Sequence, residues 1–451
     1  MKAYGTKTVL KAHGTNTVPW LLFLMLALAP ASLRAQGIPL NPPIPESLGV
    51  NIHFTSPQPG EMQELAAAGF RWVRMDFNWA EIEREKGRYD FSAYDQLMAA
   101  LAPYHIRPIF ILDYTNKFYD HGLSPYDAAG RQAFANWVAA AVEHFQGRGV
   151  VWEMYNEPNW KFWSPKPNVQ DYIKLALKVG ETIREDSPGE TYIGPAGSTV
   201  DLRFLAACFQ AGLLNYWDGV SIHPYRQRVP ETVIRPYYAV NWLIDKYEPR
   251  GKHIPVIAGE WGYPSTPNWF DMSDEGQAKM LAREFLTNIA EDVPITIWYD
   301  WHDDGGDPKD PNLHYGVVRN AYQPGGDPVY APKPAYFASQ TLSRFFSGYT
   351  FRKRLAVMGA EDYILLFTRG SDARLAAWTT SKSAHAITIP GARGKFRVIG
   401  YKGTKMHSLR AHRDGLKINL SDAPQYLMPL KTNGLHGLTS GEQADPPKGE
   451  D

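Results

Sequence analysis

The chain of 451 residues is short of cysteine and of net charge. Its single cysteine, Cys208, excludes an intramolecular disulfide, and its apolar neighbours indicate a small buried side chain rather than a nucleophile. Lys and Arg together number 47, and so do Asp and Glu, so the formal net charge is zero. A nucleic-acid-binding protein needs a basic surplus to neutralise phosphates, so no nucleic-acid partner is expected.

Long hydrophobic runs are also lacking. The apolar run at residues 20–29 is shorter than the roughly 20 residues of a bilayer span. Basic residues precede this run and small residues follow it, so residues 1–35 are predicted to be a secretory signal peptide, with an uncleaved anchor as the alternative. We therefore expect a secreted or periplasmic protein with no integral membrane span in the mature chain.

Several catalytic motifs are missing. The sequence contains no His-Glu-x-x-His, no Gly-x-Ser-x-Gly and no phosphate-binding glycine-rich loop, and no Gly-x-Gly-x-x-Gly follows the first predicted strand. These absences argue against a zinc peptidase, a serine hydrolase of the nucleophile-elbow type and a dinucleotide-binding enzyme. We expect neither a cofactor nor a metal.

Aromatic residues, by contrast, are abundant. They make up 13% of the chain, with 14 Trp and 25 Tyr, within a hydrophobic share of 44%. The aromatic share is larger than a core usually needs, and it indicates a cleft in which the flat faces of a ligand stack on aromatic rings.

Short apolar runs alternate with helical patterns along the first three quarters of the chain. The predicted strands are residues 48–53, 70–77, 106–113, 150–155, 191–195, 217–223, 255–259 and 294–298. Eight buried strands separated by helices indicate a parallel sheet and favour an α/β fold of the (β/α)₈ barrel type over residues 36–348. A doubly wound open sheet is the alternative.

The pattern changes near residue 349. Short alternating runs separated by turn residues predict a small antiparallel β domain, sandwich-like, over residues 349–431. Residues 432–451 are polar and are predicted to form a disordered tail.

In a (β/α)₈ barrel the functional residues lie at the carboxyl ends of the strands. Two glutamates, Glu157 and Glu260, end the fourth and seventh predicted strands, so the barrel would bring them to one cleft. Glycosidic cleavage needs such a pair, with one carboxyl protonated and the other ionised. A structural salt bridge, for instance to Arg74, is the other interpretation of either glutamate. The remaining candidates at strand ends are Arg74, Asp113, Asn156, His223, Tyr225, Trp261 and Trp298.

These residues carry a family resemblance over residues 48–346. Tyr155-Asn-Glu-Pro-Asn159 resembles the acid/base motif of the clan A glycoside hydrolases, and the segment at 256–262 is similar to their nucleophile strand. His223-Pro-Tyr225 is similar to a family 5 motif, whereas the added β domain and the Asn-Glu-Pro-Asn form resemble family 39. Family 5 commonly has a histidine after strand three, where this chain has Asp113, so its family within the clan stays open.

The resemblance implies a role for each residue. It makes Glu157 the general acid and then base, Glu260 the nucleophile, and Asn156 a partner of the sugar 2-hydroxyl. It also implies that Arg74 and Tyr225 hold Glu260 ionised and that His223 positions Glu157 or a sugar hydroxyl. Four tryptophans near the rim are candidate sugar platforms: Trp160, Trp163, Trp261 and Trp298.

The predicted function is that of a secreted retaining glycoside hydrolase acting on an oligo- or polysaccharide. The alternatives are an inactive carbohydrate-binding protein and a transglycosylase. Without residues 1–35 the chain has 43 basic and 47 acidic residues, a net charge of −4 that favours a neutral glycan. Sugar, linkage, endo or exo action and oligomeric state do not follow from the sequence.

Overall fold

A computed structural model describes residues 37–267, 272–357 and 359–439. The predicted signal peptide and the last part of the predicted tail lie outside these ranges. Within them, no helix combines the length and the apolar character that crossing a membrane requires.

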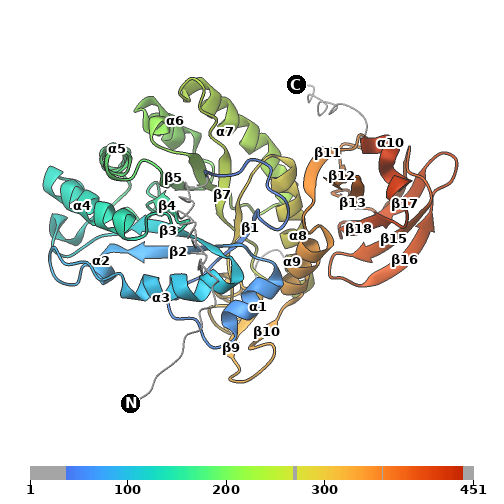
Figure 1. Ribbon diagram of the computed structural model, residues 1–451, viewed down its shortest axis with the longest axis horizontal. Helices are drawn as coiled ribbons and strands as arrows, with labels where there is room; N and C mark the ends of the chain where they lie inside the picture. Colours follow the sequence, from blue (N-terminus) through green and yellow to red (C-terminus); the bar gives the residue numbers. More distant parts are fainter. Residues whose placement is uncertain (1–36, 268–271, 358, 440–451) are drawn as a thin grey trace, which may run out of the picture. The chain divides into compact units, whose positions relative to one another are not determined.

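The strands of the first part close into a parallel barrel of eight (Figure 1). They are β1 (Leu48–Asn51), β2 (Trp72–Asn78), β3 (Arg107–Asp113), β4 (Val151–Met154), β5 (Thr191–Ser198), β6 (Gly219–His223), β7 (Val256–Trp261) and β8 (Thr296–Trp298). The barrel closes because β1 pairs with both β2 and β8. The predicted (β/α)₈ barrel is confirmed, and the open-sheet alternative is wrong.

Helices between the strands surround this barrel (Figure 1). They are α1 (Glu61–Ala68), α2 (Trp79–Ile82), α3 (Ser92–Leu101), α4 (Ala128–His144), α5 (Val169–Asp186), α6 (Leu202–Gln210), α7 (Ile234–Tyr247), α8 (Asp274–Ala290) and α9 (Pro334–Phe345). A separate cluster of buried strand residues, including Trp72, Ile109, Val151, Ile193 and Ile257, packs together. Such a layer makes the barrel interior a packed core rather than a pore.

A small antiparallel sheet pairs β9 (Val318–Tyr322) with β10 (Tyr330–Pro332) between β8 and α9. Two further antiparallel sheets follow α9, which confirms the predicted β domain. The larger has the order β11-β12-β13-β18-β15-β16, and the smaller pairs β14 with β17. Their strands are β11 (Thr350–Arg354), β12 (Asp362–Arg369), β13 (Asp372–Thr379), β14 (His385–Ile389), β15 (Lys395–Gly400), β16 (Lys405–Arg410), β17 (Leu416–Leu420) and β18 (Gln425–Pro429). The sequence pattern missed β11 and β16, the basic strands at the two edges of the larger sheet, and also β18, which lies between β13 and β15. A charged edge strand lacks clear alternation.

A buried polar contact joins this β domain to the barrel. The Trp378 indole N–H donates to Glu231 Oε1 at 2.6 Å, and Glu231 also receives two bonds of 2.7 Å from Arg283 on α8. The Arg283 pair is bidentate, which fixes the geometry of the contact.

The structure differs from the sequence prediction at the start of the tail. Residues expected to be disordered form η6 (Thr432–Leu435) and the short α10 (His436–Thr439). Leu435 is fully buried and joins the core of the β domain, and Leu438 packs against it. Two leucines in a polar segment therefore supply the apolar contact that orders it.

Candidate active site

Arg74, on β2, lies at the centre of the polar residues at the barrel mouth. It is almost wholly buried, and each of its five N–H groups has an acceptor. Nε donates to Glu153 Oε2 at 2.6 Å, Nη1 to Asn51 Oδ1 at 3.3 Å and Glu260 Oε2 at 2.7 Å, and Nη2 to Asn156 Oδ1 at 2.8 Å and His223 Nε2 at 3.2 Å. One side chain thus links strands β1, β2, β4, β6 and β7.

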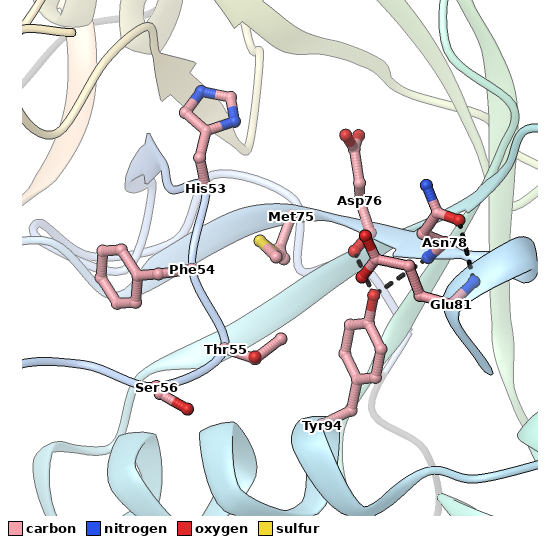
Figure 2. A pocket seen from close by; sticks show the side chains of 9 residues that line it. All are labelled: His53, Phe54, Thr55, Ser56, Met75, Asp76, Asn78, Glu81 and Tyr94. Carbon is pink, nitrogen blue, oxygen red and sulfur yellow. Dashed lines mark hydrogen bonds between the residues drawn. The ribbon is translucent and has the colours of Figure 1, made fainter.

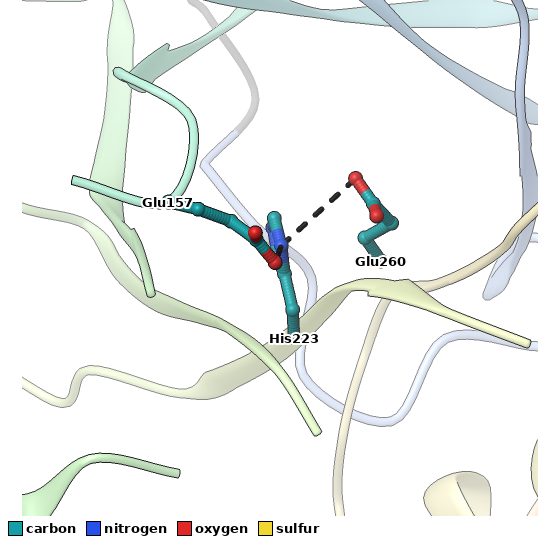
Figure 3. A group of neighbouring side chains, drawn as sticks. All are labelled: Glu157, His223 and Glu260. Carbon is teal, nitrogen blue, oxygen red and sulfur yellow. Dashed lines mark hydrogen bonds and ion pairs between the residues drawn. The ribbon is translucent and has the colours of Figure 1, made fainter. Parts of the chain in front are cut away.

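The two predicted glutamates meet at this mouth (Figure 3). One oxygen of Glu157, one of Glu260 and one ring nitrogen of His223 all lie within 4.8 Å of one another. Tyr225 donates its hydroxyl to Glu260 Oε1 at 2.9 Å, so Glu260 is bonded by Tyr225 at one oxygen and by Arg74 at the other. The barrel therefore brings together residues that are 103 positions apart in the sequence.

His223 contacts the second glutamate, Glu157. Its Nε2 faces an N–H of Arg74 and must accept, so the ring proton lies on Nδ1 and is donated to Glu157 Oε1 at 3.0 Å. Complete burial lowers the pKa of His223 to about 4, against the opposing charge of Glu260. The imidazole is therefore neutral at neutral pH and positions Glu157 without adding charge.

The surroundings of the two carboxyl groups differ. Burial raises the pKa of Glu157, and this effect outweighs the Ser198 hydroxyl and the charge of Arg74, which lower it. Glu260 instead forms a close ion pair with Arg74 and accepts a phenol hydrogen bond. A carboxyl whose pKa is raised, beside a carboxylate paired with a cation, is the division of roles that acid and nucleophile need.

The backbone after β4 aims Glu157 into the mouth. Glu157 has φ 44° and Tyr155 has φ 65°, both in the left-handed region that side chains rarely adopt. The Glu157 N–H donates to Ala196 O at 2.9 Å, which anchors the turn to β5. Such conformations persist where the surrounding structure holds them, and they are concentrated at functional sites.

A buried layer beneath the site escaped the sequence analysis. Glu153 on β4 is fully buried and accepts from Arg74 and, at 2.5 Å, from the Ser221 hydroxyl. A Cβ on Gly259 would lie 2.2 Å from that hydroxyl oxygen and 3.0 Å from Glu153 Oε1, so only glycine fits there. The available signal was a glutamate inside the apolar strand β4, where a buried charge needs a partner.

Asp113 lies at the end of β3 as predicted, but its neighbour is another carboxyl, that of Asp76. It is fully buried, and no donor of the described residues reaches either of its oxygens. Burial first, and the charge of Asp76 second, raise the pKa of Asp113 well above its ordinary value. Next along the chain, Tyr114 accepts from Asn156 Nδ2 at 2.9 Å.

The four tryptophans proposed as platforms are not equivalent. Trp261 and Trp298 have no exposed surface and Trp163 has 2%, whereas Trp160 is 56% exposed. The first three therefore pack inside the wall, and Trp298 donates its indole N–H to Tyr315 O at 3.2 Å. Whether a tryptophan is exposed depends on the residues that pack over it. A position near a strand end in the sequence does not reveal that packing.

The spacing of Glu157, His223 and Glu260 would also suit a metal ion. A cation already occupies this place, however, because the Arg74 guanidinium lies 2.7 Å from Glu260 and its N–H faces His223. A second cation would be repelled, so the residues fit proton transfer and nucleophilic attack better than metal binding.

Comparisons with known proteins bear on the fold that carries this site. The sequence matches no protein-family model and no curated protein. Among solved structures it is similar to a family 39 glycoside hydrolase from the gut symbiont Bacteroides cellulosilyticus WH2, with 27% identity, coverage of 85% of this chain and 81% of that one, and a TM-score of 0.73. The chain is a glycoside hydrolase with the fold of the clan A enzymes.

More distant structures share the fold of this glycoside hydrolase. A family 39 β-xylosidase from Caulobacter crescentus is 18% identical, with 85% and 96% of the two chains covered and a TM-score of 0.61. A family 30 endoxylanase from Clostridium papyrosolvens C71 is 12% identical, with 86% and 97% covered and a TM-score of 0.59. These two structures show a shared fold, and the family 39 structure at 27% identity confirms the clan resemblance predicted from the motifs.

Proposed function

We propose that this glycosidase acts by double displacement with retention of anomeric configuration, with Glu157 as acid/base and Glu260 as nucleophile. The observation that carries the proposal is the approach of the two carboxyl groups, of which one oxygen each lie within 4.8 Å of one another. Retaining enzymes place their carboxyl groups about 5–5.5 Å apart, whereas inverting enzymes leave about 6.5–9.5 Å for a water molecule.

The first displacement uses each contact described above. A Glu260 oxygen bonds to the anomeric carbon as the bond from that carbon to the leaving oxygen breaks, and Glu157 gives its proton to that oxygen. Asn156 Oδ1 accepts a hydrogen bond from Arg74, and one N–H of Asn156 Nδ2 donates to the Tyr114 hydroxyl. Its second amide N–H remains available to the sugar 2-hydroxyl.

The second displacement reverses the proton movement. Glu157, now a carboxylate, takes a proton from water, whose oxygen bonds to the anomeric carbon while the ester bond to Glu260 breaks. The sugar leaves with its original configuration, and both glutamates return to their first states.

We also propose that the enzyme is exported. The support is the basic start, apolar run and small residues of the first 35 positions. Sequencing the amino terminus of the protein recovered outside the producing cells tests this point, and Gln36 is the expected first residue.

A covalent trap tests the catalytic proposal directly. A dinitrophenyl 2-deoxy-2-fluoro-glycoside loses its phenolate when Glu260 attacks, and the fluorine slows hydrolysis of the resulting ester. We expect one fluorosugar per chain by intact-protein mass spectrometry, located by peptide mapping on Glu260. A chain that turns over the parent glycoside but never acquires the label would contradict the double displacement, and a binding protein would do neither.

The pH profile tests the acid. Glu157 must be protonated in the free enzyme, and burial raises its pKa. The alkaline limb of kcat/KM should therefore fall at a pH above the ordinary range of a glutamate, with activity lost as the pH rises through that pKa. Because the pKa of His223 is lowered to about 4, no separate histidine step is expected near pH 6.5.

The alkaline limb is measured from initial rates between pH 3 and 9, for the wild-type enzyme and for the Glu157→Gln variant. On an activated aryl glycoside, which needs little protonation, the variant should lose the alkaline limb. A limb that stays unchanged in Glu157→Gln would assign the titration to another group.

A further inference from the structure

Positive and negative charge are separated in this chain. The cavity of about 370 Å³ beside β1 and β2 is lined by Asp76 and Glu81, and no lysine or arginine occurs among the lining residues that the structure describes (Figure 2). Residues 393–417, from just before β15 to the start of β17, contain eight Lys and Arg and a single acidic residue, Asp414. The rest of the chain has 39 basic and 46 acidic residues. One segment of the β domain is therefore strongly basic within an acidic protein.

The register of two strands places part of this charge on one face. β15 and β16 are antiparallel neighbours (Figure 1), and their opposed pairs are Lys395–Arg410, Arg397–Ser408 and Ile399–Lys405. Directly opposed residues share a face, and so do residues two apart in a strand. Phe396 and Val398, which alternate with the residues of this face, are fully buried in the core of the β domain. The opposite face thus carries four cations, which we call the basic row: Lys395, Arg397, Lys405 and Arg410.

The basic row has no acidic partner. Its four side chains are exposed, and within residues 37–267, 272–357 and 359–439 none of them forms an ion pair or a hydrogen bond. Lys402, between the two strands, differs because it is bound to Glu275 of α8 at 2.5 Å. The row therefore offers positive charge and N–H donors to an acceptor from outside the chain.

Protection of a sheet edge explains only part of the row. Charged side chains keep an exposed edge strand from pairing with other chains, and Lys405 and Arg410 lie on the edge strand β16. Lys395 and Arg397, however, lie on β15, which is paired on both sides, with β16 and β18. Lys395 is also directly opposite Arg410, and like charges in that position destabilise a sheet. An arrangement that costs stability, and that edge protection does not require, points to a ligand of opposite charge.

The shape of the row favours a linear polymer. From Lys395 to Ile399 the strand extends roughly 13 Å, whereas two neighbouring strands are only about 5 Å apart. A small anion reaches one or two of the cations at a time. A chain with repeated anionic groups can lie along the strands and reach all four.

Two other polyanions fit less well. Phe396 and Tyr401 are the aromatic residues of the basic segment, and both are buried, so the bases of a nucleic acid find no ring on which to stack. Anionic lipids are concentrated in the cytoplasmic leaflet of a membrane, from which the proposed export removes the chain.

We propose that the basic row on β15 and β16 binds an anionic polysaccharide, whose carboxylate or sulfate groups accept hydrogen bonds from its lysines and arginines. This site lies in the β domain and shares no residue with the glutamate pair of the barrel. It would hold the enzyme on an acidic glycan. The choice of a glycan over a lipid rests on the proposed export, whereas the binding itself does not depend on catalysis.

Three polymers with one backbone test the charge requirement. Binding of the purified protein to dextran, carboxymethyl-dextran and dextran sulfate is measured by biolayer interferometry. We expect binding to the two anionic polymers and none to dextran, with affinity at least 10-fold higher at about 50 mM than at about 200 mM NaCl, because bound counterions are released. Equal binding to neutral dextran would overturn the proposal.

A triple variant locates the binding on the row. Lys395→Gln, Arg397→Gln and Arg410→Gln together should weaken binding to dextran sulfate at least 10-fold. The slope of log affinity against log salt should become shallower by about 2, since each cation that neutralises an anionic group contributes about 0.7–0.9. The variant should melt at or above the temperature of the unmodified protein, because the repulsion between opposed cations is removed.

The matched control removes three exposed cations elsewhere. These substitutions are Arg203→Gln, Arg250→Gln and Lys382→Gln. The control should bind dextran sulfate as the unmodified protein does. An unchanged affinity in the row variant, or an equal loss in the control, would overturn the assignment.

Two further ligands and the covalent label separate the remaining outcomes. Vesicles containing phosphatidylserine and a single-stranded oligonucleotide are tested in parallel, and tighter binding of either one through the same residues would overturn the choice of a glycan. Labelling of Glu260 without binding to dextran sulfate would reject the basic row alone. Binding that requires the row in a protein that acquires no label would support the row and reject only the catalytic proposal.

Discussion

Replacing Glu260 with Gln should lower kcat/KM by about 10⁴-fold or more, which is the scale seen when a covalent nucleophile is removed. The amide cannot form the glycosyl ester, and Arg74 loses the carboxylate that it holds at 2.7 Å. The loss should be equally severe for natural glycans and for activated aryl glycosides, because both need the nucleophile. Steady-state rates with the two substrate types measure it.

Glu157→Gln supplies the contrast for that experiment. Loss of a general acid costs about 10²–10⁴-fold when the leaving group needs a proton and much less when it does not. Glu185→Gln, on the exposed face of α5, removes the same charge elsewhere and should leave the rates unchanged. If the rate loss depended on the leaving group to the same degree in the Glu157 and Glu260 variants, the assignment of Glu157 as acid and Glu260 as nucleophile would be contradicted.

Replacing Arg74 with Met should destabilise the fold and abolish activity. The change leaves the buried Glu153 and the half-buried Glu260 without their shared cation and removes five hydrogen bonds. Breaking a buried ion pair from one side costs about 3–5 kcal/mol. Urea unfolding followed by tryptophan fluorescence should show a loss of that size in apparent stability.

Lysine at the same position gives a finer test. Arg74→Lys keeps the charge, but an ammonium has three donors for five acceptors, so stability should recover in part and activity should not. Arg71→Met is the matched control, because Arg71 is partly exposed and lies 3.8 Å from Glu46. An exposed pair of this kind contributes about 0–1 kcal/mol. An equal loss of unfolding free energy in Arg74→Met and Arg71→Met would contradict a specific stabilising role for Arg74.

Much of the barrel could be predicted from local pattern. Eight strands such as residues 106–113 are short apolar runs because parallel strands are buried on both faces. Where a polar residue ends such a run, as Glu157 and Glu260 do, the rule that function lies at the carboxyl ends of the strands identifies it. Three strands of the β domain were missed: β11 and β16, charged strands at the sheet edges, and β18 inside the sheet.

The amino-acid sequence by itself determined the order of strands and helices, the barrel, and the two glutamates, since these depend on local periodicity and on position at a strand end. Only the tertiary structure decided the contacts of Arg74, the buried partner Glu153, the burial of Asp113 near Asp76, and the burial of Trp261 and Trp298. Barrel closure brings together side chains that are far apart in the chain, and the loops around the mouth decide which remain exposed. Pattern identifies the residues, but hydrogen-bond partners, exposure and pKa arise from these long-range contacts.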